Sequence, residues 1–220
     1  MSISAQDKPY RSAPLGFGSI RARPPVAMAG QRIGLLGGSF NPAHDGHIGL
    51  SQSALKRLGL CSVWWLVSPG NPIKSHADLA AHVQRLRTAR ARASADRRIV
   101  VTGFEKDLPT AYTAATLGFL RRRYPATRFV WLMGADSLAS LDRWRHWRTI
   151  LETMPVAVID RPGWRLRGLS SKASARYADR FVPEDCAALL AGMKAPAWTF
   201  LTVPLSPHSS TALRAAQAKK

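Results

Sequence analysis

Residues 32–50 read RIGLLGGSFNPAHDGHIGL, and the predicted fold depends on this stretch. The apolar run at 33–36 predicts a buried strand, and apolar residues at helical spacing over 48–58 predict a helix that stops at Gly59. A glycine turn separates the two elements. Because such a turn lets backbone N–H groups approach a phosphate, and a helix N-terminus adds unpaired donors and partial positive charge, this order of elements predicts an anion site.

Two histidines, His44 and His47, stand where the predicted helix begins. At this spacing they face the same way in a helix, and each offers a neutral or charged N–H donor. No Gly-Lys-Ser/Thr follows the glycines, and the third glycine of a dinucleotide fingerprint is missing. A metal site on the pair lacks a Cys or carboxylate cluster to complete it. The alternative, two exposed histidines that cap a helix, leaves the glycine turn unexplained, so we predict a phosphate contact.

The composition bounds the class of protein. A chain of 220 residues suits one α/β domain, and no apolar run approaches a membrane span, so we predict a cytoplasmic protein without a membrane partner. The chain has 32 Lys+Arg against 13 Asp+Glu, a formal net charge of +19, which calls for polyanionic partners such as nucleic acid, or ATP with a nucleotide monophosphate. Cys61 and Cys186 lie in apolar settings and predict buried, reduced thiols.

Strand-like and helix-like segments alternate along the chain. Apolar, β-rich runs at 62–67, 98–102, 128–133, 156–159 and 198–203 alternate with helical patterns. This order predicts an α/β fold, a Rossmann-like doubly wound parallel sheet, as a single domain over 31–220 with a small C-terminal helical part.

Three segments depart from that pattern. Residues 1–30 are rich in Pro, Gly, Ser and Arg without periodicity and predict a disordered basic N-terminal extension. Residues 164–196 predict an irregular basic insert with one short helical stretch around 184–190. Residues 80–95 predict an amphipathic helix whose arginines, Arg85 among them, lie on a solvated face.

Candidate ligand contacts follow several of the strands. In a parallel sheet, the carboxyl ends of strands meet at the ligand crevice. Lys74 follows the second strand and is a phosphate contact or an ordinary surface lysine. Asp136 either accepts hydrogen bonds from ribose hydroxyls or caps the next helix. Arg161 is a candidate contact to ATP phosphates.

Two tryptophans, Trp144 and Trp147, lie three residues apart among arginines. Such a segment suits an RNA surface, a core face with solvated arginines, or a single indole platform for a cationic pyridinium ring.

A second anion site is predicted near the C-terminus. Hydroxyls at 209–211 stand at the start of a helical pattern, and Arg214 follows Ser210 by one helical turn. They predict a phosphate cradle, against the simpler alternative of a capped helix. Two anion sites, one at each end of the chain, predict a single polyphosphate held between them.

Residues 37–47, GGSFNPAHDGH, resemble the GGxFxPxHxGH signature of the HxGH nucleotidylyltransferases, and most of all their bacterial nicotinate-nucleotide adenylyltransferase branch. Asn41 stands where that family commonly has Asp, which keeps a turn-forming side chain. The resemblance runs over residues 32–214. It includes the family's Gly-x-Asp-Ser at 134–137 and its Arg-Pro-Gly at 161–163.

Two further motifs bear on the substrates. The family's Ser/Thr-Tyr-Thr loop, which in relatives receives the nicotinate carboxylate, resembles residues 110–113. Its Ile-Ser-Ser-Thr-x-x-Arg motif matches 208–214, except that His208 stands where an apolar residue is usual.

The resemblance implies a set of site residues. His44, His47 and Arg214 would be catalytic. ATP would contact Gly37, Gly38, Ser39, Phe40, His44, His47, Gly134, Asp136, Arg161, Ser209, Ser210, Thr211 and Arg214. Nicotinate mononucleotide would contact Ser39, Lys74, Tyr112, Thr113 and Trp144. Mg²⁺ would be held through the phosphates, without a dedicated protein metal site.

The resemblance also implies a reaction, in which ATP and nicotinate mononucleotide give deamido-NAD and pyrophosphate. Other members of the superfamily use nicotinamide mononucleotide or phosphopantetheine as acceptor, and they are the first alternative. A basic nucleic-acid-binding protein is the alternative from another class, but it leaves both phosphate cradles unexplained. The sequence leaves homo-oligomerisation open.

Overall fold

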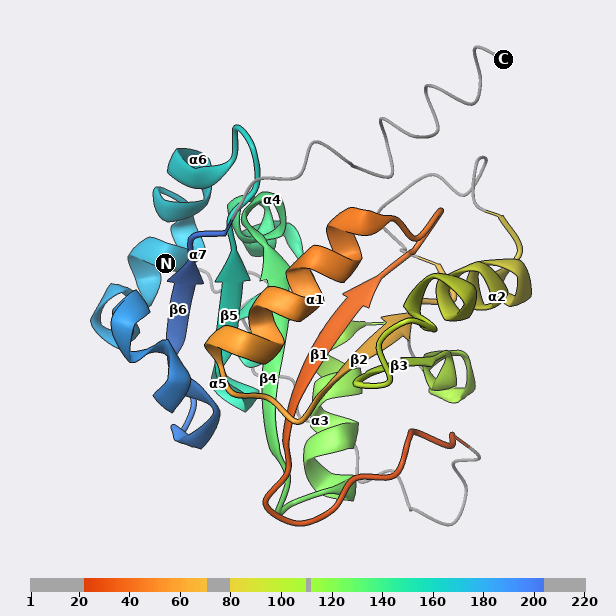
Figure 1. The fold of residues 1–220 in the computed structure, drawn as a ribbon. Coiled ribbons are helices and arrows are strands. Elements are labelled where there is room, and N and C mark those ends of the chain that lie inside the picture. Colours follow the sequence, from red (N-terminus) through yellow and green to blue (C-terminus); the bar gives the residue numbers. More distant parts are fainter. Residues whose placement is uncertain (1–21, 71–79, 110–111, 204–220) are drawn as a thin grey trace.

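The computed structural model describes residues 22–70, 80–109 and 112–203. Within them the chain forms a six-stranded parallel sheet in the order β3-β2-β1-β4-β5-β6 (Figure 1). The strands are β1 Arg32–Gly38, β2 Ser62–Val67, β3 Ile99–Thr102, β4 Arg128–Gly134, β5 Val156–Ile159 and β6 Trp198–Leu201. This order and direction confirm the predicted doubly wound α/β fold.

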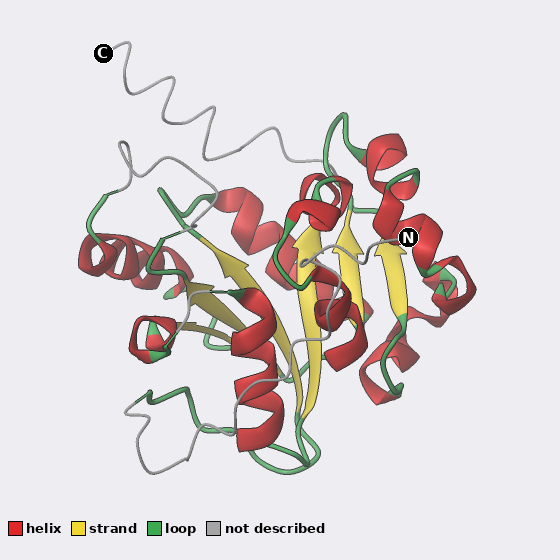
Figure 2. Cartoon of the chain, turned by 180° about the vertical axis from the view of Figure 1, so that it is seen from behind, coloured by secondary structure: helices red, strands yellow, loops and turns green. Residues whose placement is uncertain are grey.

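Helices cover both faces of the sheet (Figures 1 and 2). One face packs against α1 (Asp45–Arg57), α2 (His82–Ala93) and η4 (Glu184–Gly192). The other packs against α3 (Thr113–Arg123), α4 (Ala135–Ala139), α5 (Trp147–Thr153) and α7 (Lys172–Arg176). The remaining helices are η1 Phe104–Asp107, η2 Leu141–Arg143, α6 Arg165–Leu169 and η3 Ala178–Arg180. Among the described residues, no helix is both long and apolar enough to cross a membrane.

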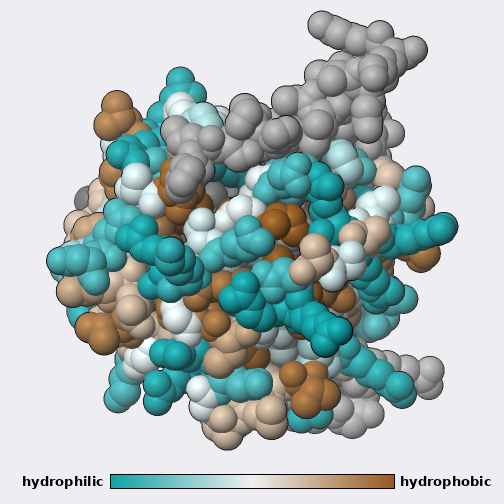
Figure 3. Space-filling model, viewed as in Figure 1, coloured by the Kyte–Doolittle hydropathy of each residue, from teal (hydrophilic) through white to brown (hydrophobic). Residues whose placement is uncertain are grey.

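The strands are apolar without interruption because both faces of the sheet are buried. In β2, Trp64 belongs to the core under α3 and α5, whereas its neighbour Trp65 belongs to the core under α1 and α2. Both side chains are almost fully buried. The surface of the α1 and α2 face is largely hydrophilic, with hydrophobic side chains scattered over it (Figure 3).

Two predictions of irregular structure need correction in part, and residues 1–21 of the first lie outside the described residues. Residues 22–30 are held against the domain, because the Tyr124 hydroxyl donates to the Pro25 carbonyl at 2.9 Å and the Thr127 hydroxyl donates to the Met28 carbonyl at 3.2 Å. Residues 164–196 contain α6, α7, η3 and η4. Their buried side chains, such as Leu190, belong to the two cores. The helical stretch predicted around 184–190 is present as η4, whereas α6, α7 and η3 were missed because each is too short to show a period.

The cysteine prediction is also wrong in one respect. Cys61 and Cys186 are free thiols, as expected, but both are exposed. Cys61 lies in the connection from α1 to β2, and Cys186 lies on η4 beside the buried Ala187. The apolar neighbours in the sequence therefore point inward while the thiols point outward.

We predict that Gly37→Ala lowers the free energy of unfolding by about 1–3 kcal/mol, the usual cost of overpacking a core. A Cβ at Gly37 would collide with Cη2 of Trp131 on the neighbouring strand β4. Gly49→Ala is the matched control, because Gly49 lies within α1 and its Cβ would meet no atom within 4 Å. Alanine there should stabilise the helix by about 0.5–1 kcal/mol. Urea unfolding measures both changes, and equal effects would refute the packing argument.

Candidate active site

The glycine turn lies where β1 leaves the sheet. β1 pairs with β2 on one side and β4 on the other, so its carboxyl end lies at the point where the strand order reverses. Phe40 follows with a φ of 48°, a left-handed conformation that is uncommon for a bulky residue. Its ring is buried, 4.9 Å from the Trp65 ring and 4.7 Å from the His47 ring between centroids. Packing therefore holds this strained residue in place.

His44 and His47 come together at the start of α1, as predicted. His44 is the N-cap residue and is only 3% exposed, and the two ring centroids are 4.0 Å apart. The Gly46 N–H donates to His44 Nδ1 at 3.1 Å, and the His44 N–H donates to His47 Nδ1 at 3.3 Å. Because each Nδ1 accepts a hydrogen bond, the ring proton of each histidine lies on Nε2.

The charge of His47 follows from its surroundings. Burial, the neighbouring His44 and the positive charge of Arg161 lower the pKa of His47 to about 3. The sequence left its charge open, and the structure makes it a neutral N–H donor at pH 7.

The helix that carries His47 is further held in place by Ser51. Its hydroxyl donates to the His47 carbonyl and accepts from the Trp65 indole, both at 2.8 Å.

The ends of β4 and β5 bring Gly134, Asp136 and Arg161 together. Nη1 of Arg161 lies 3.4 Å from Oδ2 of Asp136. A Cβ at Gly134 would collide with Oδ1 of Asp136 and lie 2.8 Å from Nε of Arg161, so only glycine leaves room for the pair. Asp136 is the second residue of α4, whose N-cap residue is Gly134. Its Oδ1 is buried and has no hydrogen-bond partner within the described ranges, which leaves an acceptor for a ligand.

A second group of predicted residues lies around the start of α3. Tyr112 is the N-cap residue of this helix and Thr113 is its first residue. Arg145, which the sequence did not single out, donates from Nη1 to the Tyr112 hydroxyl at 3.1 Å, and its guanidinium carbon lies 4.9 Å from the centre of the Tyr112 ring. The structure therefore brings the segment that contains Trp144 to the start of α3.

The two tryptophans differ in burial. Trp144 is partly buried at the edge of the core, whereas Trp147 is only 8% exposed and its ring meets Tyr177 edge to face at 6.2 Å. Trp147 is a core residue, so the paired-tryptophan RNA surface is not formed. Trp144 keeps a partly exposed ring.

An unpredicted network holds the chain where it leaves β6. Asp160 is buried at the end of β5, where its Oδ1 accepts from the Arg161 N–H at 2.8 Å and its Oδ2 accepts from Nε of Arg165 at 2.8 Å. Arg165 also donates to the Thr202 hydroxyl at 3.3 Å, and the Thr202 N–H donates to Glu184 at 2.8 Å. These bonds join β5, α6, η4 and the end of β6.

Arg85 contradicts the prediction for α2. We expected a solvated arginine, but Arg85 is 1% exposed and its side chain donates to backbone carbonyls of two loops. The apolar Val83 on the same helix is instead 76% exposed. The spacing contains the signal, because Arg85 lies one and two helical turns before the buried Ala89 and Ala93.

Some predicted residues cannot be placed. Lys74, Ser209, Ser210, Thr211 and Arg214 lie outside the described residues, so their roles remain predictions. Within the part of the chain that the structure describes, no three His, Cys, Asp or Glu side chains gather as a metal-binding group.

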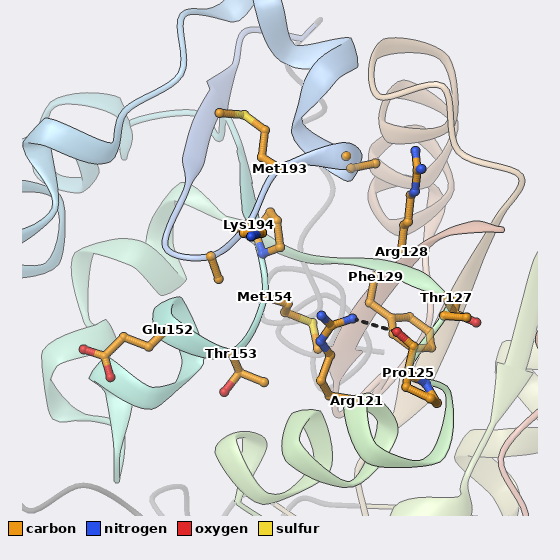
Figure 4. Close-up of a pocket in the computed structure, with 15 residues that line it drawn as sticks. Arg121, Pro125, Thr127, Arg128, Phe129, Glu152, Thr153, Met154, Met193 and Lys194 are labelled. Atoms are coloured by element: carbon orange, nitrogen blue, oxygen red, sulfur yellow. Dashed lines mark hydrogen bonds between the residues drawn. The ribbon is translucent and has the colours of Figure 1, made fainter. Parts of the chain in front are cut away.

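A hollow of about 510 Å³ lies elsewhere, at the amino ends of β4 and β5 (Figure 4). Arg121, Arg128, Glu152 and Lys194 are among its lining residues, and none of the predicted site residues is. The histidines lie at the carboxyl end of β1, so this hollow is at the opposite end of the parallel strands. It is not part of the predicted nucleotide site.

A glycine turn with two N–H-donating histidines at the switch point of a doubly wound sheet defines a nucleotidylyltransferase class of protein. A family model described as cytidylyltransferase-like matches residues 35–216. The probable nicotinate-nucleotide adenylyltransferase of Methylorubrum extorquens is 56% identical over 183 residues, 83% of this chain and 98% of that protein. The protein of the same description from Cereibacter sphaeroides is 52% identical over 83% of this chain and 96% of its own length.

The chain therefore belongs to the cytidylyltransferase-like family and, within it, to the nicotinate-nucleotide adenylyltransferases. A solved structure agrees in fold. The Plasmodium falciparum nicotinic acid mononucleotide adenylyltransferase complexed with NaAD is 15% identical, with a TM-score of 0.64 over 84% of this chain and 83% of that one.

We predict a pH-dependent stability that comes from His47. Its folded pKa of about 3 lies below the ordinary value near 6.5, so the unfolded chain binds more protons between these limits. This contribution is fully present above pH 6.5 and is lost as the pH falls toward 3. Between pH 7 and pH 5 the parent should therefore lose more unfolding free energy than His47→Asn. Since the ring is partly exposed, we expect this difference to be only about 1 kcal/mol. Urea unfolding at both pH values tests this, and identical losses in parent and variant would contradict it.

Proposed function

We propose that this protein transfers the adenylyl group of ATP to nicotinate mononucleotide, giving deamido-NAD and pyrophosphate. The observation that carries the proposal is the histidine pair beside the glycine turn, in which each Nδ1 accepts a backbone hydrogen bond and burial keeps His47 neutral through its lowered pKa. The family supports the choice of substrates, because the relatives at 56% and 52% identity are described as nicotinate-nucleotide adenylyltransferases.

The chemistry needs no nucleophile from the protein. A phosphate oxygen of the acceptor attacks the α-phosphorus of ATP in line, the bond from that phosphorus to the bridging oxygen breaks, and pyrophosphate leaves with the electron pair. Such a reaction is accelerated mainly by positioning and by stabilising charge on the transferring group. The reaction therefore matches a site built from hydrogen-bond donors and positive charge.

Each described residue has a proposed part in this reaction. His44 and His47 donate from Nε2 to the α-phosphate oxygens. Arg161, which lies close enough to His47 to lower its pKa, supplies positive charge on the same side. Asp136 accepts from a ribose hydroxyl through its buried Oδ1. Residues 209–214 are proposed to hold the β- and γ-phosphates.

Mg²⁺ is proposed to enter with ATP. Of the described residues to which we assign a part in the reaction, Asp136 is the one carboxylate. A single carboxylate suits a cation held mostly by phosphates and water. When bound, the cation would neutralise phosphate charge, which the uncharged His47 cannot do.

The acceptor is proposed to bind at the start of α3. The backbone N–H groups of the first turn, at Tyr112 and Thr113, favour a carboxylate over an uncharged amide. The partly exposed Trp144 is proposed to stack on the pyridinium ring.

We expect His47→Ala to lower kcat by at least about 10²-fold, because removal of one donor to a developing anion typically costs 10²–10³-fold. Pyrophosphate release from ATP and nicotinate mononucleotide measures this, and circular dichroism checks the fold. Gln52→Ala is the control, since Gln52 is exposed on the same helix. A folded His47→Ala enzyme with the parent's turnover would remove His47 from the mechanism.

The acceptor site predicts a preference that can be measured. Since a hydrogen bond to a charged group contributes about 1.5–3 kcal/mol, kcat/KM should be roughly 10–100-fold higher for nicotinate than for nicotinamide mononucleotide. Tyr112→Phe should keep this preference, because we assign the recognition to backbone N–H groups and not to the hydroxyl. Faster turnover of the amide would refute the proposed carboxylate site.

A further inference from the structure

Arg85 on α2 is a buried cation whose hydrogen-bond partners are all backbone carbonyls. Its Nε donates to Ala80 O at 2.9 Å and its Nη2 donates to Pro69 O at 3.1 Å. A single nitrogen, Nη1, donates to Ser39 O at 2.6 Å and to Ser68 O at 2.8 Å. Among the described residues, Arg85 pairs with no acidic side chain, and backbone carbonyl dipoles solvate its charge.

Such an arrangement is costly, because burying a charge without a counter-ion loses its hydration. Burial lowers the pKa of Arg85, but a guanidinium remains protonated in proteins. If α2 only needed to be attached to the sheet, an apolar residue would serve, as Ala89 and Ala93 do on the same face. The buried arginine therefore indicates a requirement that is specific to the two loops it joins.

The two loops are those that follow β1 and β2. They meet directly, because the Ser68 N–H donates to the Gly38 carbonyl at 3.0 Å. Arg85 adds a second bridge beside this bond, between the carbonyl of Ser39, the residue after Gly38, and the carbonyl of Ser68 itself. His82, one turn earlier on α2, hydrogen-bonds to the Val67 carbonyl at 2.9 Å. One helix thus holds the ends of both strands in register.

The bridge also orients the peptide between Ser39 and Phe40. This peptide bond is trans and planar, so its carbonyl and its N–H point in opposite directions. With the Ser39 carbonyl held toward Arg85, the Phe40 N–H faces the opposite side of the loop. The same bond restrains Phe40, whose φ of 48° is strained and whose ring packs on His47.

We propose that Arg85 is a positioning residue for the anionic substrates: it fixes the loop after β1 relative to the loop after β2, and it places a guanidinium beneath the phosphate-binding turn. This role rests on the proposed function and deepens it. It differs from a purely structural role, because it predicts a loss of substrate affinity and turnover in enzyme that remains folded.

The test compares Arg85→Lys and Arg85→Ala with Arg87→Lys and Arg87→Ala. Arg87 is exposed on the same helix, so each control makes the same change in charge and composition. Lysine retains the charge, but one ammonium cannot reproduce the planar fork that reaches both loops. We expect kcat/KM for ATP to fall about 10²-fold in Arg85→Ala and at least about tenfold in Arg85→Lys, with both Arg87 variants close to the parent.

Steady-state rates are measured well below the unfolding temperature of each variant, and circular dichroism confirms the fold. Added guanidinium at millimolar concentration should restore part of the activity of Arg85→Ala and should not affect Arg87→Ala. If Arg85→Ala does not fold, Arg85→Lys decides the question. Folded Arg85 variants with the parent's kcat and KM, and a loss of thermal stability alone, would overturn the proposal. Full activity in Arg85→Lys would overturn the claim that the guanidinium must bridge the two loops.

A separate measurement distinguishes this proposal from the proposed function. If the parent and the Arg87 variants release no pyrophosphate from ATP and nicotinate mononucleotide, the proposed function fails. The role of Arg85 is then decided by isothermal titration with ATP, for which we expect at least about tenfold weaker binding by Arg85→Lys than by the parent. Equal affinities would overturn the role of Arg85.

Discussion

The site depends on the parallel pairing of β1 with both β2 and β4. This pairing puts the glycine turn at the point where the strand order reverses, and it places the ends of β2, β4 and β5 around it. Gly37 and Gly134 allow the close approaches there, because Trp131 and the Asp136–Arg161 pair fill the space that a Cβ would occupy. The position of the proposed anion site is therefore a consequence of strand order.

The site combines neutral donors with separate positive charges. His47 is kept neutral by burial and by Arg161, so the two histidines contribute oriented N–H groups. Positive charge comes instead from arginines that belong to other elements, Arg161 at the end of β5 and Arg85 beneath the loop. A fixed arrangement of this kind stabilises developing charge without reorganising during the reaction.

Local patterns predicted most of the fold. The strands β2 and β5 were predicted at their observed bounds, because an apolar run buried on both faces is a local signal. Within 164–196 the stretch around 184–190 was predicted and forms η4, but α6 and α7 were missed, since they span about one turn each. Arg85 was assigned to the solvated face because arginine is rarely buried. Three of the four carbonyls that accept its hydrogen bonds belong to residues 16–46 positions away in the sequence.

The sequence alone determined the order of strands and helices, the glycine turn with its histidine pair, and the family, because each is encoded within a short segment. Tertiary structure alone decided the protonation of His47, the pairing of Asp136 with Arg161, the burial of Arg85 and the exposure of both thiols. These properties depend on which distant groups surround a side chain. Solvation and electric field are set by those neighbours, and neighbours exist only once the chain has folded.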